Sequence, residues 1–148
     1  MKIYLDTSVI SALFDNKNPE RKALTEEFFS GIRLYRTYIS ELSLVEIAKT
    51  PDKSLRDKMR QVAKRFSILE INEEVEKLAS EYVRYKAVPK SYSEDTYHIA
   101  VAVLNEIDYL LSWNFRHIVR KRTRDIVRMI NTLRNLKSIE IITPGELL

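Results

Sequence analysis

Short apolar segments and longer amphipathic segments alternate along this chain. Residues 2–5 form an apolar segment that ends at Asp6, which is typical of a short buried strand. Residues 99–103 are apolar nearly all round, so the helix that contains them is predicted to be central and buried. The helix that follows Asn72 is predicted to be amphipathic, because its apolar side chains recur at helical spacing. That buried face consists of Val75, Leu78, Ala79 and Tyr82.

The same pattern, with capping and turn residues, predicts the remaining elements. Strands are predicted at residues 2–5, 34–39, 67–71, 108–112 and 139–142. Helices are predicted over residues 9–14, 20–29, 54–66 and 114–136, and after the capping residues Ser40, Asn72 and Ser93. This alternation predicts an α/β fold, a mostly parallel sheet covered on both faces. No repeat or linker interrupts it, so residues 1–148 are expected to form a single domain.

The composition excludes several kinds of site. The 148 residues include no cysteine, two histidines and two glycines. Disulfides, thiol nucleophiles, cysteine-based metal sites, a P-loop and a glycine-rich dinucleotide motif are therefore excluded. No apolar run is long enough to span a membrane, and the first residues lack the apolar stretch of a signal peptide. We therefore expect a cytoplasmic protein with no membrane association.

The net charge of +4 is concentrated towards the C-terminus. Between residues 116 and 137, the only acidic side chain is Asp125. The basic side chains there are Arg116, Arg120, Lys121, Arg122, Arg124, Arg128, Arg134 and Lys137. Such a concentration is typical of a surface that binds a polyanion, although a solvated helix face has the same composition.

Polar side chains follow several of the predicted strands. Asp6 ends the first strand, Glu46 lies in the helix after the second, and Asp95 lies in the first turn of the central helix. Ser112 and Asn114 follow the fourth strand. In such folds, ligands bind beyond the C-terminal ends of the strands. Converging carboxylates repel each other, and a hard cation with oxygen ligands, Mg²⁺ or Mn²⁺, relieves that repulsion. Such ions activate water and polarise phosphoryl groups, which favours a phosphodiester substrate.

Each of these residues also has an ordinary structural explanation. Asp6 and Asn114 are common helix N-caps, and Glu46 is typical of a surface ion pair. Asp95 in a first turn complements the helix dipole. Spacing alone therefore does not establish that these side chains converge.

Five segments, in order along the chain, resemble the motifs of PIN domains. The first is a hydrophobic strand followed by Asp-Thr-Ser, and the second has a Glu in the helix after the second strand. The third is an Asp that leads an Ala-rich helix, and the fourth follows the fourth strand. The segments are residues 3–8, 43–47, 95–102, 108–115 and 142–144.

The resemblance implies both a fold and an activity. The fold would be a three-layer α/β/α sandwich with a central parallel sheet of about five strands. PIN proteins carry an acidic pocket for Mg²⁺ or Mn²⁺ and cleave RNA, commonly as VapC-type toxins of toxin–antitoxin pairs. They are often homodimers and are neutralised by a small partner protein. A metal-dependent endoribonuclease acting on single-stranded RNA is therefore expected.

Residue roles carry over by position. Asp6 and Asp95 would bind the metal ion directly, and Glu46 would bind it or orient its water. Asn114 completes the expected catalytic set, although many family members carry a further Asp near this position. The amide lowers the negative charge of the site, so we expect one firmly bound ion rather than two. The side chains expected to contact the substrate are Thr7, Ser8, Ser112 and Arg116.

Other interpretations stay open at this point. A non-catalytic PIN-like module that binds nucleic acid or protein fits the same motifs. A phosphatase with an Asp after its first strand fits less well, because a second Asp is usual where Ser8 stands. No residue distinguishes RNA from DNA. His98 and His117 could each reach the site, but a buried structural role fits them as well, and Trp113 fits a core position.

Overall fold

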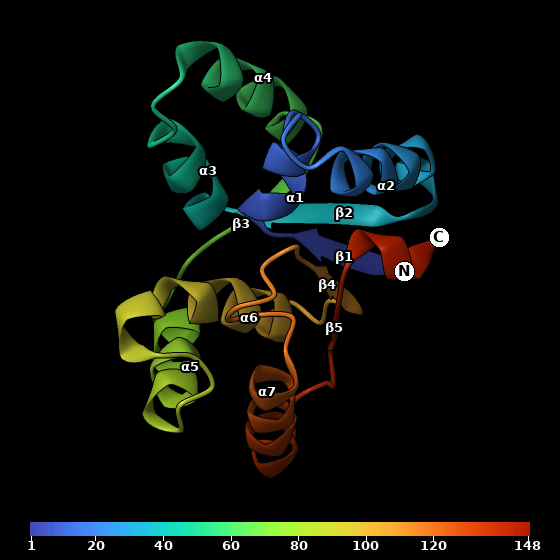
Figure 1. The fold of residues 1–148 in the computed structure, drawn as a ribbon. Coiled ribbons are helices and arrows are strands. Elements are labelled where there is room, and N and C mark those ends of the chain that lie inside the picture. The colour runs from blue at the N-terminus through green and yellow to red at the C-terminus, as the bar shows by residue number, and fades with distance from the viewer.

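A parallel five-stranded sheet forms the middle layer of the computed structural model, which describes residues 1–148 (Figure 1). The strand order is β3-β2-β1-β4-β5, and every neighbouring pair is parallel. The predicted α/β fold with five strands is confirmed. The strands are β1 (Lys2–Leu5), β2 (Arg36–Ser40), β3 (Ser67–Leu69), β4 (Tyr109–Leu111) and β5 (Glu140–Ile142).

Helices cover both faces of this sheet, as Figure 1 shows. One face carries α1 (Thr7–Ala12), α2 (Pro19–Ser30), α3 (Glu41–Ala48) and α4 (Lys53–Ala63). The other face carries α5 (Glu73–Arg84), α6 (Glu94–Leu104) and α7 (Lys121–Leu133). Three 3₁₀ helices connect or end these elements: η1 (Ile32–Leu34), η2 (Lys90–Tyr92) and η3 (Pro144–Leu147). No helix has both the length and the apolar composition required to cross a membrane.

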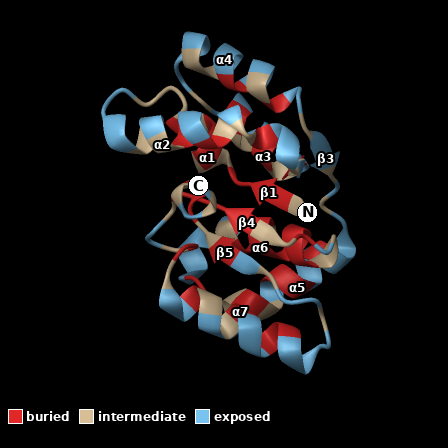
Figure 2. Ribbon diagram, turned by 90° about the vertical axis from the view of Figure 1, so that its right-hand side faces the viewer, coloured by how far each residue is buried: buried red, intermediate tan, exposed pale blue.

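The strands separate two apolar cores. Ile3 and Leu5 pack into the core beneath α1–α4, whereas Tyr4 packs into the core beneath α5–α7. Successive residues of a strand point to opposite faces of the sheet. All three side chains are fully buried because helices cover both faces. Figure 2 shows this buried centre, with exposed residues on the outer sides of the helices. The apolar run of α6 is buried as predicted.

Two predicted helix starts were wrong. The helix expected from Asn114 begins only at Lys121, because the chain first makes a tight turn in which the Asn114 carbonyl accepts from the amides of Ile118 and Val119. Ser93 does not cap α6, because η2 leads directly into it and Ser93 already has helical dihedral angles. Both errors arise where a polar residue that favours caps sits in a turn instead.

The order of the strands positions the site. β1 lies at the centre, with β2 and β3 to one side and β4 and β5 to the other. The chain therefore leaves β1 and β4 towards different faces at neighbouring positions, and such a switch point is where α/β sheets bind ligands. Leu5 pairs with Leu111, and the Asp6 amide donates to the Leu111 carbonyl at 3.2 Å. The residues after β1 and β4 therefore lie side by side.

Candidate functional site

Asp6 occupies this switch point with both carboxylate oxygens hydrogen-bonded. Ser8 donates to Oδ1 and Ser112 donates to Oδ2, each at 2.5 Å. The serine hydroxyls are fixed in turn, because they accept the backbone amides of Trp113 and Asn114 at 2.9 Å. Burial raises the pKa of Asp6, and the neighbouring His98 and these hydrogen bonds only partly offset that rise. The carboxylate is thus rigidly oriented but costly to keep ionised.

Glu46 reaches the same region from α3. Its Oε1 accepts hydrogen bonds from the Thr7 hydroxyl at 2.5 Å and from His98 Nε2 at 2.8 Å. Burial raises the pKa of Glu46, but the hydrogen bond and charge of His98 outweigh it, so the pKa is lowered. Oε2 has no protein partner. Glu46 is therefore an ionised carboxylate with one oxygen available.

His98 lies beneath these carboxylates, fully buried on α6. Its Nδ1 is 2.5 Å from the Tyr4 hydroxyl, and Tyr4 is also hydrogen-bonded to Ser40. Burial opposes charge on the ring, but Tyr4 and the carboxylates of Glu46 and Asp6 raise the pKa of His98 well above its usual value. The two ring nitrogens of His98 therefore connect Glu46 to Tyr4.

Asp95 joins from the first turn of α6. Asn114 Nδ2 donates to its Oδ2 at 3.4 Å, and His117 Nδ1 lies 3.3 Å from the same oxygen. Burial raises the pKa of Asp95, the neighbouring histidines lower it, and the charges of Asp6 and Glu46 raise it further. Oδ1 has no protein partner.

These carboxylates influence one another electrostatically, so the structure brings them to one region. We call Asp6, Glu46 and Asp95 the acidic cluster. Their oxygen donors and mutual repulsion suit a hard divalent cation, and Glu46 and Asp95 each keep one oxygen free of protein partners. No three of the His, Asp and Glu side chains, however, are arranged closely enough to share one ion as they stand. The chemistry of the donors fits such an ion, and the coordination geometry is not formed.

The other predicted site residues divide into two groups. Thr7, Ser8, Ser112 and Asn114 all lie at the cluster and hold its carboxylates. Arg116 is exposed, and its side chain makes no hydrogen bond or ion pair with the cluster.

The sequence alone left the roles of His98, His117 and Trp113 open, and the structure places all three side chains. His98 and His117 contact Glu46 and Asp95 respectively, so both belong to the site as partners of its carboxylates. The signal for His98 was its position one helical turn after Asp95. Trp113 is a core residue, as the sequence favoured: it is 8% exposed and its indole nitrogen donates to Thr25.

Solved structures share this fold at low sequence identity. VapC20 from Mycobacterium tuberculosis, described as a toxin that cleaves the sarcin–ricin loop, has a TM-score of 0.62 and 15% identity, covering 76% of this chain and 90% of that one. VapBC2 from Rickettsia felis, bound to a promoter DNA fragment, has a TM-score of 0.58 and 15% identity, covering 95% and 97%. A toxin–antitoxin complex from Klebsiella pneumoniae has a TM-score of 0.59 and 14% identity, covering 79% and 89%. At these identities the matches show the fold alone.

Comparison of the sequence itself gives the family. No curated protein matches it. A family model described as PIN domain matches residues 3–120. That segment contains β1 to β4 and every residue of the acidic cluster. Because the match spans most of the 148 residues, this chain belongs to the PIN domain family.

Proposed function

We propose that this protein is a metal-dependent endoribonuclease that hydrolyses phosphodiester bonds of single-stranded RNA. The observation that carries the proposal is the acidic cluster at the switch point of a PIN-domain sheet. Water would add to phosphorus while the bond to one ribose oxygen breaks, which leaves one phosphate monoester and one hydroxyl. An RNA substrate places this activity in the cytoplasm.

Asp6, Glu46 and Asp95 would hold Mg²⁺ or Mn²⁺, which when bound polarises the phosphoryl group and activates water. The neighbouring side chains keep these ligands oriented. Ser8 and Ser112 fix both oxygens of Asp6. Such outer partners matter because the productive geometry of a site tolerates only small displacements.

Glu46 and Asp95 each have a polar and a histidine partner. Thr7 and His98 fix Oε1 of Glu46, which leaves Oε2 to face the ion or its water. Asn114 and His117 hold Oδ2 of Asp95. His98 also supplies positive charge under the cluster, which lowers the electrostatic cost of three adjacent carboxylates before any ion binds.

We also propose that the protein is the toxin of a toxin–antitoxin pair. Two of the structural neighbours are toxin–antitoxin assemblies, which supports a small antitoxin protein as partner. We further propose a homodimer, as is common in the family. Co-expression with the adjacent open reading frame followed by size-exclusion chromatography with light scattering tests both.

The first experiment is cleavage of a fluorophore–quencher single-stranded RNA with Mn²⁺, Mg²⁺ or EDTA. Wild-type protein is expected to cleave only with metal, and Asp6→Asn and Asp95→Asn are expected to lose at least about 100-fold in rate. The matched control is Asp57→Asn, an exposed carboxylate on α4, which should retain wild-type activity. Cleavage that persists in EDTA or in both cluster variants would contradict the proposal.

One observation favours a second candidate, a non-catalytic module that binds nucleic acid or protein. Asn114 stands where an acidic residue would add a ligand, and its amide is directed at Asp95. The same samples separate the two functions, because a module without a metal site would show neither cleavage nor a rise in melting temperature with Mn²⁺.

A further inference from the structure

The basic stretch of residues 116–137 divides into paired and unpaired side chains in the folded chain. Lys121, Arg134 and Lys137 each form an ion pair with a carboxylate. Arg120 and Arg122 form none and point instead towards the end of α5. The stretch is therefore not one uniform surface, and two of its unpaired arginines lie at the start of α7.

Arg120 and Arg122 line a cavity of about 620 Å³ with three basic residues from another part of the chain. Five of the nine lining residues are basic and none is acidic. None of the five basic side chains forms an ion pair. We call this site the basic cavity, defined by Arg84, Lys86, Lys90, Arg120 and Arg122.

Backbone carbonyls hold the two arginines of the basic cavity in place. Arg120 donates to the Ala87 carbonyl at 2.9 Å and to the Thr123 hydroxyl at 2.8 Å. Arg122 donates to the Lys86 carbonyl at 3.1 Å. These neutral partners orient the guanidinium groups without cancelling their charge. Ordering them therefore costs little when an anion binds.

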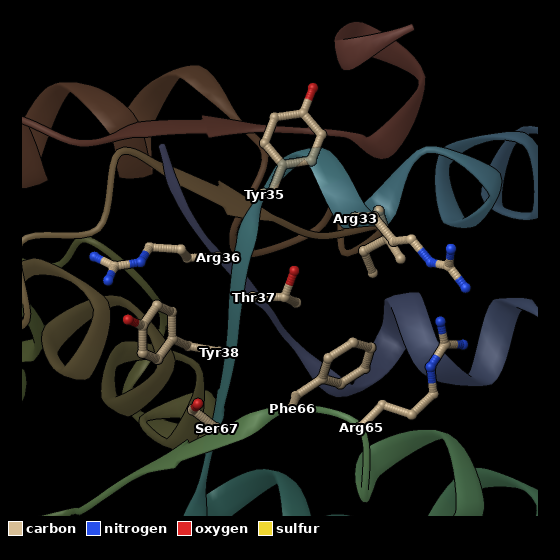
Figure 3. A pocket seen from close by; sticks show the side chains of 9 residues that line it. Arg33, Tyr35, Arg36, Thr37, Tyr38, Arg65, Phe66 and Ser67 are labelled. Atoms are coloured by element: carbon tan, nitrogen blue, oxygen red, sulfur yellow. The ribbon is translucent and has the colours of Figure 1, made fainter.

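A second arginine-containing cavity is a weaker candidate for an anion site. It has a volume of about 450 Å³ and lies where β2 and β3 begin, at the opposite edge of the sheet from Asp6. Figure 3 shows Arg33 and Arg65 on one side of β2 and Arg36 on the other. Its arginines are therefore divided between two sides of the strand, and only Arg33 and Arg65 share a side.

A series of contacts through η2 connects the basic cavity to the acidic cluster. Lys90 lines the cavity and is the first residue of η2, and Tyr92 is the last residue of η2. The half-exposed Tyr92 ring stacks on His117 with a centroid distance of 4.1 Å, and His117 contacts Asp95. Through η2, a residue that lines the basic cavity is therefore joined to a partner of Asp95.

We propose that the basic cavity binds backbone phosphates of the single-stranded RNA whose scissile bond lies at the acidic cluster. This inference rests on the proposed function. The cluster is net negative and repels RNA, so binding requires positive charge within reach of the same strand. The chemistry recognised is a phosphodiester, since guanidinium and ammonium groups with no competing carboxylate bind phosphate through charge-assisted hydrogen bonds. Because phosphates carry no base identity, the basic cavity sets affinity and strand path rather than sequence preference.

The test is binding of a labelled single-stranded RNA in EDTA, measured by fluorescence anisotropy over a range of salt concentrations. The pocket variant is Lys86→Gln/Lys90→Gln, because both lysines are exposed and their side chains make no hydrogen bond or ion pair. The matched control is Lys53→Gln/Lys58→Gln, two exposed lysines of α4 on the other face of the sheet (Figure 1). Both variants lose the same formal charge, and melting temperatures verify that both fold.

The pocket variant should bind RNA several-fold more weakly than the control. Its slope of log affinity against log salt should fall by about 1.4, because each lost phosphate contact on a single strand contributes about 0.7. With metal, its KM should rise while kcat stays at the wild-type value. Equal affinity and slope in the two variants would overturn the inference.

Two further measurements distinguish binding of an RNA strand from binding of other anions. Inorganic phosphate or a mononucleotide that displaces RNA at equal phosphate concentration would overturn the strand assignment. Poly-glutamate binding that depends on Lys86 and Lys90 as strongly as RNA binding does would also overturn it. The assay needs no catalysis, so loss of RNA binding in the pocket variant supports the phosphate site even where cleavage fails. Normal cleavage with equal binding in both variants refutes the site and leaves the proposed function standing.

Discussion

The acidic cluster and the basic cavity differ in how their charged side chains are paired and exposed. Each carboxylate of the cluster has hydroxyl, amide or imidazole partners, and burial raises the pKa of Asp6 and Asp95. In the basic cavity the side chains are mostly exposed, and none has a carboxylate partner. Charge that is buried and oriented suits a small ion in one position, whereas charge left exposed suits a mobile polyanion. In the proposed function, the acidic cluster therefore carries the chemistry and the basic cavity binds the strand.

The largest effect expected from this contrast is a pH-dependent response to metal in the cluster. Because the pKa values of Asp6 and Asp95 are raised, these groups contribute stability below pH 3.8 that is lost as pH rises through their native pKa values. Metal binding competes with the same protons and so has the opposite trend. Mn²⁺ at about 100 times its Kd should stabilise the protein by about 2.7 kcal/mol near neutral pH, and by progressively less in acid.

Differential scanning fluorimetry with Mn²⁺ or EDTA from pH 4 to pH 7.5 measures this response. Asp95→Asn should lose the metal-induced rise in melting temperature, and the exposed control Asp57→Asn should keep it. A rise that is the same at every pH would show that protonation of the cluster does not compete with metal.

Adding a fourth carboxylate to the acidic cluster should increase its difference from the basic cavity. Asn114→Asp replaces an amide that donates to Asp95 with a carboxylate that repels it. Without metal, we expect a loss of about 1 kcal/mol, the equivalent of somewhat less than one pKa unit of mutual repulsion. With Mn²⁺ the same variant should gain more stability than wild type, because a fourth carboxylate strengthens cation binding.

Asn135→Asp is the control for that comparison, since Asn135 is exposed and its side chain makes no hydrogen bond. Melting temperatures in EDTA and in Mn²⁺ supply both measurements. A metal response in Asn114→Asp no larger than that of wild type would mean that residue 114 does not face the ion.

The fold and the positions of Asp6 and Ser112 were predictable because they depend on local patterns, whereas Glu46 and Asp95 were assigned from the resemblance to PIN domains. Apolar strands that end at Asp6 and before Ser112 place both residues at the same sheet edge once the strands pair in parallel. The cap at Asn72 was equally local: its side chain accepts the Val75 amide at 3.0 Å. Each of these signals is contained within a few neighbouring residues.

The remaining features depend on contacts between distant segments. The ion pair of His98 with Glu46 joins residues far apart in sequence, and only the folded structure shows it. The basic cavity was missed for the same reason. Lys86 and Lys90 reach Arg120 only because the chain reverses after α5, where Lys86 adopts a positive φ of 62°. The high density of basic residues in the sequence therefore did not reveal which side chains lack a carboxylate partner in the folded chain.

The smallest effect concerns Lys137, which belongs to the same basic stretch but is already paired. Its Nζ lies 2.7 Å from Asp108 Oδ1 and 3.2 Å from the Glu106 carbonyl. Hydrogen bonds from Lys137 and from the Lys2 amide lower the pKa of Asp108. Stability from this carboxylate is therefore present above pH 3.8 and lost as pH falls through its lowered native pKa.

Lys137→Gln should cost less than about 1 kcal/mol at neutral pH, because the ion pair is partly exposed. Its melting temperature should approach that of wild type as the pH falls through the lowered native pKa of Asp108. RNA affinity should not change, in contrast to the single variant Lys86→Gln, which removes the same charge from an unpaired site. Thermal unfolding and RNA anisotropy on these two variants measure both quantities. Equal losses of RNA affinity would show that net charge, and not its unpaired fraction, governs RNA binding.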